Sequence, residues 1–185
     1  MPFICFIFLS LIGSFLTTHV SAQTIIQGDE LKTINNDVIH DYAINEVAFM
    51  RQTQMASNIS VYINATQRIV CSGDGLLLST PAGSTAYNAS AHGPILPLGV
   101  HLLALTPLAV YKPRNWKGAI LKDSDDIEFI VNAHEKRRVN MTYDNNMIEN
   151  IKSIKVKINK ERQFKLLFNP NTCLEDRILK EQFSH

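Results

Sequence analysis

The sequence predicts a mostly β protein, an antiparallel β-sandwich accompanied by a few short helices. Three observations lead to this prediction. Short apolar and β-branched segments recur along the chain between turn signals, and only two stretches show helical spacing. With 185 residues and 45% hydrophobic side chains, the chain is long enough to bury one core. We therefore expect one β domain at residues 23–185, preceded by a hydrophobic segment at residues 1–22.

The predicted strands are short runs of apolar residues bounded by polar or turn residues. The clearest is the run IKSIKVKI at 151–158, in which apolar residues recur near every second position while the lysines stay in water. In chain order, the predicted strands are 43–51, 59–63, 75–79, 100–105, 127–131, 138–143, 151–158 and 164–168.

The two predicted helices are 84–91 and 174–183. The first follows a turn in which Pro81 presets φ and Gly83 permits a positive φ. A hydroxyl of Ser84 or Thr85 is expected to cap this helix, leaving backbone N–H groups that point outward near the positive end of the helix dipole. Such an end can receive an anion or a sugar phosphate. Its local pattern fits an ordinary capped helix equally well.

Charge and cysteine content exclude several classes of protein. Lys and Arg total 18 and Asp and Glu total 17, so the net charge of +1 creates no field that would attract nucleic acid or an anionic membrane. Cys5, Cys71 and Cys173 are widely spaced and form no CxxC pair. We expect reduced, buried thiols and no metal site built from cysteines.

The first 22 residues leave the compartment open. Residues 2–16 are almost wholly apolar, and Ala22 ends a small-residue pattern typical of signal-peptide cleavage. However, no Lys or Arg precedes Lys32, and the apolar run is short for a membrane span. The segment is therefore either a signal peptide or a remnant or misread start. We expect a cytoplasmic protein, with secretion as the alternative.

The most informative stretch is residues 74–95, DGLLLSTPAGSTAYNASAHGPI. It resembles the signature of the NAD kinase family, in which a DG pair leads through a strand into STPxGSTAY. Residues 43–47, AINEV, are similar to the NE motif that begins the family's carboxy-terminal domain. Residues 105–107, 112–119 and 176–183 resemble members of the alphaproteobacterial type. The resemblance runs from about residue 41 to the end of the chain.

This resemblance implies a function in NADP biosynthesis, the ATP-dependent phosphorylation of the adenosine ribose 2′-hydroxyl of NAD. It implies ATP and a divalent metal, Mg²⁺, as well as NAD as the substrate, and it implies a homo-oligomer. Asn45 and Glu46 match the pair that contacts the ribose, and Asp74 matches the aspartate near the nicotinamide end of the ligand. The other NAD-binding positions implied by the resemblance are Thr85, Ala86, Tyr87, Asn88, Ser90 and, least securely matched, Asp144.

One family element has no match. The GGDG motif, whose aspartate serves as the base in a Rossmann-like amino-terminal domain, is missing from this sequence; SGDG at 72–75 corresponds to the second DG instead. The resemblance therefore assigns no catalytic residue and no metal ligand to this chain.

Three hypotheses remain open at this point. The chain is a NAD kinase half whose GGDG-containing half is lost or encoded separately, a non-catalytic NAD- or NADP-binding protein, or a secreted β-rich protein that does not use the inherited site. In the last case Asp74 and Asp144 would be ordinary turn residues, and Asn45 and Glu46 an ordinary strand end.

Overall fold

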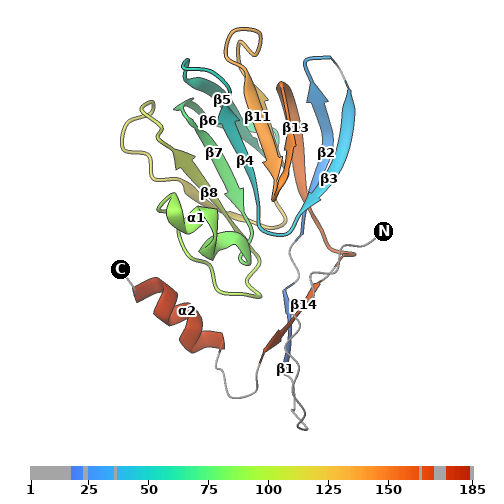
Figure 1. Cartoon of the computed structure of the whole chain (residues 1–185), viewed down its shortest axis with the longest axis vertical. Coiled ribbons are helices and arrows are strands. Elements are labelled where there is room, and N and C mark those ends of the chain that lie inside the picture. The colour runs from blue at the N-terminus through green and yellow to red at the C-terminus, as the bar shows by residue number, and fades with distance from the viewer. Residues whose placement is uncertain (1–17, 23–24, 36, 163, 169–173, 184–185) are drawn as a thin grey trace.

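The computed structural model describes residues 18–22, 25–35, 37–162, 164–168 and 174–183. Cys5, Cys173 and most of the hydrophobic segment 1–22 lie outside this part of the chain. Two six-stranded sheets, each antiparallel throughout, form the body of the protein (Figure 1). The prediction of a mostly β, antiparallel two-sheet fold with few helices is confirmed.

The order of strands places neighbours from distant parts of the sequence side by side. The first sheet contains, in order, β3 (Val38–Ala43), β2 (Ile25–Thr33), β13 (Ile151–Asn159), β10 (Ile127–Val131), β5 (Ser57–Ile63) and β6 (Thr66–Gly73). The second contains β12 (Asn146–Ile148), β11 (Val139–Tyr143), β4 (Glu46–Arg51), β7 (Gly75–Ser79), β8 (Leu102–Leu108) and β9 (Ala119–Lys122).

The core lies between the two sheets. Phe49 of β4 meets Phe129 of β10 with ring centroids 4.5 Å apart, so these aromatic side chains join the second sheet to the first. The alternation predicted for β13 is observed, because Ile154 and Val156 are buried while the residues that follow each of them, Lys155 and Lys157, are exposed. Burial of the inward-facing side chains from both sheets is the main contribution to stability.

The strands that the sequence did not predict are mostly edge strands. β3 and β6 border the first sheet, and β9 and β12 border the second. An edge strand has a neighbour on one side only, so its residues are less buried and its apolar pattern is weak. In β6, for example, residues 66–68 and Val70 are exposed. β2 was missed as well, since its sequence IIQGDELKT mixes apolar and polar residues and its pairing is irregular.

The predicted strand 43–51 is wrong in one respect. Ala43 ends β3 in the first sheet, whereas Glu46 begins β4 in the second. The chain therefore changes sheets at Ile44 and Asn45. The break falls at the polar pair Asn45 and Glu46, but a polar pair also occurs inside a continuous strand, as at 152–153 in β13, so the sequence pattern alone did not mark the break.

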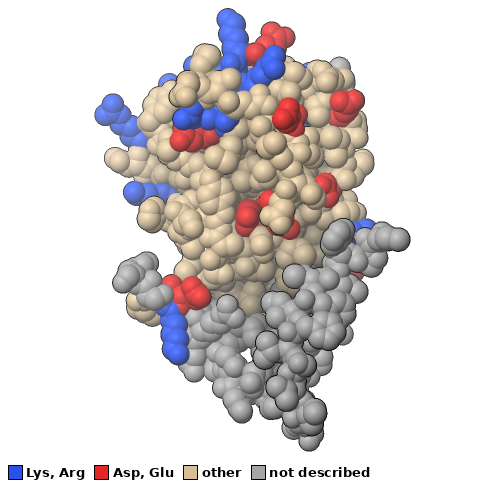
Figure 2. All heavy atoms as spheres, in the orientation of Figure 1, with Lys and Arg blue, Asp and Glu red and all other residues tan. Residues whose placement is uncertain are grey.

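Outside the two sheets, β1 (Thr18–Ala22) pairs with β14 (Phe164–Phe168), and α2 (Leu174–Phe183) follows (Figure 1). The predicted strand 164–168 and helix 174–183 are thus confirmed. No helix in the described part of the chain is long and apolar enough to span a membrane. On the face drawn in Figure 2, acidic and basic side chains are interspersed, without a large area of one charge.

We expect Phe129→Ala to lower the free energy of unfolding by about 3–5 kcal/mol, because it removes the ring that packs on Phe49 between the sheets. The control is Ile120→Ala on edge strand β9, where the side chain is 54% exposed and the change should stay within roughly 0.5 kcal/mol. Urea unfolding measures both. Equal effects of the two substitutions would contradict this account of the core.

Candidate functional site

The sheet-crossing turn at Ile44 and Asn45 is held by Asp144, which follows the last residue of β11. One carboxylate oxygen of Asp144 accepts the N–H of Ile44 at 2.8 Å. The other oxygen accepts the N–H groups of Asn45 at 2.8 Å and Glu46 at 3.1 Å. In return, the N–H of Asp144 donates to the carbonyl of Glu46 at 3.1 Å. A single side chain therefore binds three consecutive N–H groups of the turn.

The opposite side of the turn contacts the end of β7. The N–H of Thr80 donates to the carbonyl of Asn45 at 2.9 Å, and the buried Thr80 hydroxyl donates to the carbonyl of Ile44 at 2.7 Å. The same hydroxyl accepts the N–H of Gly83 at 3.1 Å. A Cβ at Gly83 would lie 2.2 Å from the Asn45 carbonyl oxygen, so this close approach requires glycine. The NE motif and the STPAGS motif are thus packed directly together.

The predicted continuous helix 84–91 is wrong. The chain forms a 3₁₀ turn, η1 (Gly83–Thr85), and then a single α-helical turn, α1 (Tyr87–Ser90), with Ala86 in a non-helical conformation between them. Neither piece has a side-chain cap. Four residues cannot build an appreciable macrodipole, so the helix dipole that the predicted anion site relied on is not present in α1.

Ser84 has a different role from the predicted cap. Its buried hydroxyl donates to the carbonyl of Pro81 at 2.8 Å and accepts the N–H of Leu96 at 2.9 Å. This pair of bonds ties the start of the 83–96 loop to its end. The Ala86 N–H, predicted to point outward, donates to the carbonyl of Gly83 at 2.9 Å.

Asn88 is completely buried, which its assignment as an NAD-binding residue did not anticipate. Its amide donates to the carbonyls of Ser84 at 3.2 Å and Pro94 at 2.9 Å, and its Oδ1 accepts the hydroxyl of Thr106 at 2.6 Å. These three bonds satisfy the side chain inside the protein. In this structure Asn88 holds the loop against β8 and presents nothing to a ligand.

The outer face of the second sheet connects the remaining candidates. Glu46, Ala48 and Met50 share this face because side chains alternate along β4. Tyr87 lies over it; the ring is 37% exposed, and its hydroxyl is 3.9 Å from the sulfur of Met50. Thr85, Ala86 and Ser90 are exposed on the same loop. The Tyr87 hydroxyl lies at the Met50 end of this face and the half-buried Glu46 carboxylate lies at the other end, so together they suit an extended ligand with a planar ring and hydroxyl groups.

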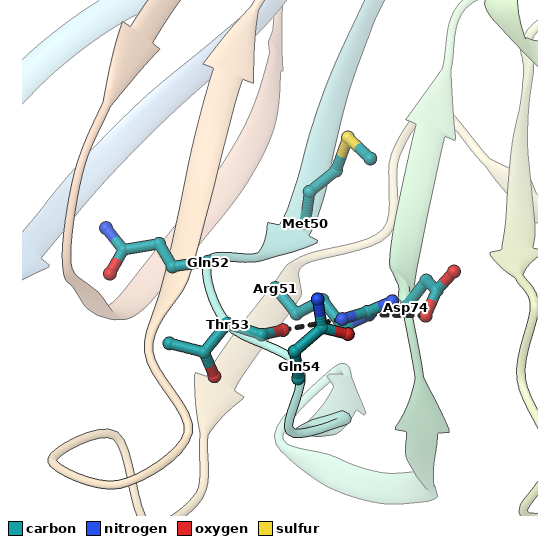
Figure 3. A pocket seen from close by; sticks show the side chains of 6 residues that line it. All are labelled: Met50, Arg51, Gln52, Thr53, Gln54 and Asp74. Atoms are coloured by element: carbon teal, nitrogen blue, oxygen red, sulfur yellow. Dashed lines mark hydrogen bonds and ion pairs between the residues drawn. The ribbon is translucent and has the colours of Figure 1, made fainter.

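Asp74 lies at the other end of β4, about 17 Å from Glu46 by the rise of an extended strand. Its carboxylate accepts the Nε–H of Arg51 at 2.5 Å, and Arg51 also donates to the carbonyl of Thr53 at 2.6 Å. Figure 3 shows the Arg51 side chain extended toward Asp74 in an open hollow also lined by Gln54. Sequence reasoning missed Arg51, whose only signal was its place at the end of the strand that begins with the NE motif.

Glu46 has an unusual electrostatic environment. Partial burial, and secondarily the negative charge of Asp144, raise its pKa to about 7 from the usual 4.5. Its Oε2 is buried, and no described residue donates a hydrogen bond to it. A buried carboxylate oxygen without a donor is costly when charged, and a ligand hydroxyl would relieve that cost.

The structure therefore sorts the sequence-predicted residues into three groups. Asn45, Glu46 and Asp144 come together at the sheet-crossing turn, and the exposed Thr85, Ala86, Tyr87 and Ser90 belong to the loop packed beside it. Asp74 lies far from Glu46, in a hollow that is also lined by Met50, the residue that the Tyr87 hydroxyl approaches, and Asn88 faces inward. Cys71 is buried, and burial raises the pKa of its thiol to about 12, so this cysteine is unreactive as expected.

The sequence of this chain matches a known protein family. Residues 44–167 match the family model of the ATP-NAD kinase C-terminal domain. This chain belongs to the NAD kinase family. It is 50% identical over 143 residues to a NAD kinase of Xanthomonas campestris, covering 77% of this chain and 55% of the relative. It is 46% identical over 150 residues to a NAD kinase of Rickettsia rickettsii, covering 80% and 59%. The chain thus spans little more than half the length of these relatives.

Solved structures share the fold. Yeast NADH kinase in complex with NADH superposes with a TM-score of 0.75 at 22% identity, over 91% of this chain and 48% of that one. A NAD kinase from Archaeoglobus fulgidus in complex with ATP gives 0.69 at 18% identity, over 88% and 59%. The two-sheet architecture is therefore that of the family.

We expect Glu46→Gln to become more stabilising as pH rises. The pKa of Glu46 is higher in the folded protein than in the unfolded chain, so the folded state holds more protons between about pH 4.5 and 7, and its stability falls across this range. After allowance for solvent screening, the gain over the parent chain should be on the order of 1 kcal/mol larger at about pH 8 than at about pH 5.

Urea unfolding at the two pH values measures this difference. Glu30→Gln is the control, because Lys155 lowers the pKa of Glu30 and removal of that carboxylate should not stabilise the protein as pH rises. A gain for Glu46→Gln that is the same at both pH values would refute the assignment of a raised pKa.

Proposed function

We propose that this chain is the dinucleotide-binding half of a NAD kinase, an enzyme that transfers a phosphoryl group from ATP to the adenosine ribose 2′-hydroxyl of NAD. In this proposal Asn45 and Glu46 read the ribose hydroxyls, and Tyr87 offers its ring to a base. Thr85, Ala86 and Ser90 supply the exposed surface beside it. Asp74 serves the nicotinamide end of a ligand held between subunits of a homo-oligomer.

The observation that supports the proposal best is the direct packing of the Asn45 turn on the Thr80–Gly83 turn. The two motifs are more than 30 residues apart in the sequence, yet the Asn45 carbonyl, the Thr80 N–H and the Gly83 backbone are in contact. This contact places Glu46, with its unpartnered buried oxygen, next to the loop that carries Tyr87. A hydroxyl donor is the ligand group that such an oxygen accepts.

The approximately 17 Å between Glu46 and Asp74 supports the homo-oligomeric part of the proposal. Side chains at opposite ends of β4, as those of Glu46 and Asp74 are, serve one compact pocket more easily if each pairs with residues of another copy. The ion pair with Arg51 keeps Asp74 extended at the surface, where a second copy could meet it.

The ATP and Mg²⁺ implied by the family are not assigned to this chain's residues. In the described ranges, no three His, Cys, Asp or Glu side chains gather closely enough to hold a metal ion. Phosphoryl transfer requires a positioned nucleophile, a triphosphate site and charge neutralisation. In our proposal a separate GGDG-containing half supplies them, and we derive no step through them here.

A second candidate is a non-catalytic NAD- or NADP-binding protein. It rests on the same proposed contacts of Asn45, Glu46 and Tyr87, which this chain supplies by itself. Both candidates predict the same affinity for NAD. Only the NAD kinase half is expected to form NADP when the GGDG-containing half is added.

We expect the folded chain to bind NAD or NADP weakly, because the proposed contacts of Asn45, Glu46 and Tyr87 are on this chain. Tyr87→Ala should weaken binding by up to about tenfold through loss of the stacking surface. Isothermal calorimetry at millimolar NAD measures both. Tyr62→Ala on β5 of the first sheet is the matched control and should leave the affinity unchanged. No heat from a protein shown to be folded would exclude the binding proposal.

We expect the purified chain alone to form no detectable NADP from NAD and ATP. Loss of a positioned general base costs on the order of 10²- to 10⁴-fold in rate, and loss of the triphosphate and metal site removes most of the remaining positioning. Adding a separately expressed GGDG-containing half from the Xanthomonas relative should restore turnover, measured with an NADP-specific dehydrogenase.

Two outcomes would change the assignment. Activity of the unaided chain that is lost in Asp74→Asn would mean that the second DG has become the catalytic site. Binding of NAD without any turnover in the presence of the added half would favour the non-catalytic candidate.

A further inference from the structure

Asp144 is used almost completely within the protein. A carboxylate offers about four lone-pair positions, and three of them accept the backbone N–H groups of Ile44, Asn45 and Glu46 at 2.8, 2.8 and 3.1 Å. Hydrogen bonds to a charged acceptor are about twice as strong as neutral ones. Little of this side chain remains for direct contact with a ligand.

The backbone of Asp144 adopts the left-handed conformation, with φ of 47°. This conformation is uncommon for a residue other than glycine, although Asp tolerates it better than most. In this conformation the Asp144 N–H donates to the carbonyl of Glu46 at 3.1 Å, and the side chain points back toward the N–H groups of residues 44–46. The preceding residue, Tyr143, is buried and pairs with Val47, so the strand end is firmly placed.

The turn held in this way carries the two side chains assigned to the ribose. Asn45 and Glu46 follow one another, and each has its N–H bound to Asp144. On the other side, the Asn45 carbonyl is bound by Thr80. The backbone that directs both side chains is therefore fixed from β11 and from β7.

We propose that Asp144 is a positioning residue for the dinucleotide site: its carboxylate holds the 44–46 backbone and thereby sets the direction of the Asn45 and Glu46 side chains without touching the ligand. This inference rests on the proposed function for the identity of the ligand. The clamp itself is a property of the free protein, so it can be tested separately.

The charge of Asp144 gives a signature that mere structural support would lack. Asp144 is the charged neighbour that acts on Glu46, and it adds to burial in raising the Glu46 pKa. In Asp144→Asn, the Glu46 pKa should fall toward its usual range while the contribution of burial persists. Carbon-detected NMR titration of labelled glutamate carboxyl groups measures this pKa in the absence of any ligand.

Asp144→Asn should also loosen the clamp, because the amide retains one acceptor oxygen and presents a donor where the second oxygen was. Amide hydrogen exchange at residues 44–46 should become faster by about tenfold or more, and NAD affinity should fall by a comparable factor. The control is Asp125→Asn in the turn between β9 and β10, where Asp125 accepts the N–H of Lys122 at 3.0 Å. Asp125→Asn should change neither the rate of amide hydrogen exchange at residues 44–46 nor the affinity for NAD.

A double-mutant cycle with Asn45→Ala distinguishes positioning from contact. If Asp144 acts through Asn45, the two losses of NAD affinity will be less than additive. Additive losses would overturn the proposal in favour of direct ligand contact. Unchanged exchange at residues 44–46 together with an unchanged Glu46 pKa would also overturn it. Failure of even the parent chain to bind NAD, with both ligand-free changes observed, would instead count against the proposed function alone.

Asp144→Glu provides the conservative variant if Asp144→Asn does not fold. It keeps the negative charge near Glu46 but moves it by one methylene. The Glu46 pKa should stay raised while exchange at 44–46 becomes faster, which separates the charge from the hydrogen bonds. Retention of full protection at 44–46 in this variant would contradict a clamp that depends on the length of the side chain.

Discussion

A chain that leaves one sheet and enters the next must turn where no neighbouring strand can bind its N–H groups. In this protein that turn lies at Ile44 and Asn45, and one carboxylate, that of Asp144, accepts the three N–H groups in succession. The N–H groups of Asn45 and Glu46 are partly buried, and leaving them without an acceptor would destabilise the fold, so this interaction allows the crossover to be both tight and well placed. β4 starts directly after this turn and pairs with β11 on one side and β7 on the other. The position of the turn therefore sets the register of β4 and which of its side chains lie on the outer face of the second sheet.

The same turn explains why two short motifs that lie far apart in the sequence pack together. Thr80 and Gly83 press against the turn from the end of β7, and any side chain at position 83 would collide with the Asn45 backbone. Close approach of two backbones leaves their flanking side chains next to each other. Asn45 and Glu46 on one side, and the loop bearing Tyr87 on the other, therefore form one surface although they lie far apart in the sequence.

The loop after Gly83 depends on buried polar groups rather than on helical structure. Ser84 and Asn88 bind carbonyls within the loop, and Thr106 fixes the Asn88 side chain to β8. The buried side chains of Ser84 and Asn88 occupy the inner side of the loop. Other positions are exposed on its outer side, namely Thr85, Ala86, Tyr87 and Ser90. Recognition at this surface would use individual side chains and N–H groups, because a helix of one turn contributes little dipole.

The sequence by itself determined the fold class, the family and the interior strands other than β2, because strands buried on the core face show clear apolar runs or alternation, as in β7 and β13. It also placed the motifs that carry the family. Only the tertiary structure showed the edge strands, which are too exposed to leave such a pattern, and the sheet change within 43–51, because a polar pair such as Asn45 and Glu46 also occurs inside continuous strands. It also decided the roles of Asn88 and Asp144. A buried amide and a ligand-facing amide are the same residue in a sequence, and partners such as Thr106, or the Ile44–Glu46 backbone nearly 100 positions from Asp144, become neighbours only when the sheets pack.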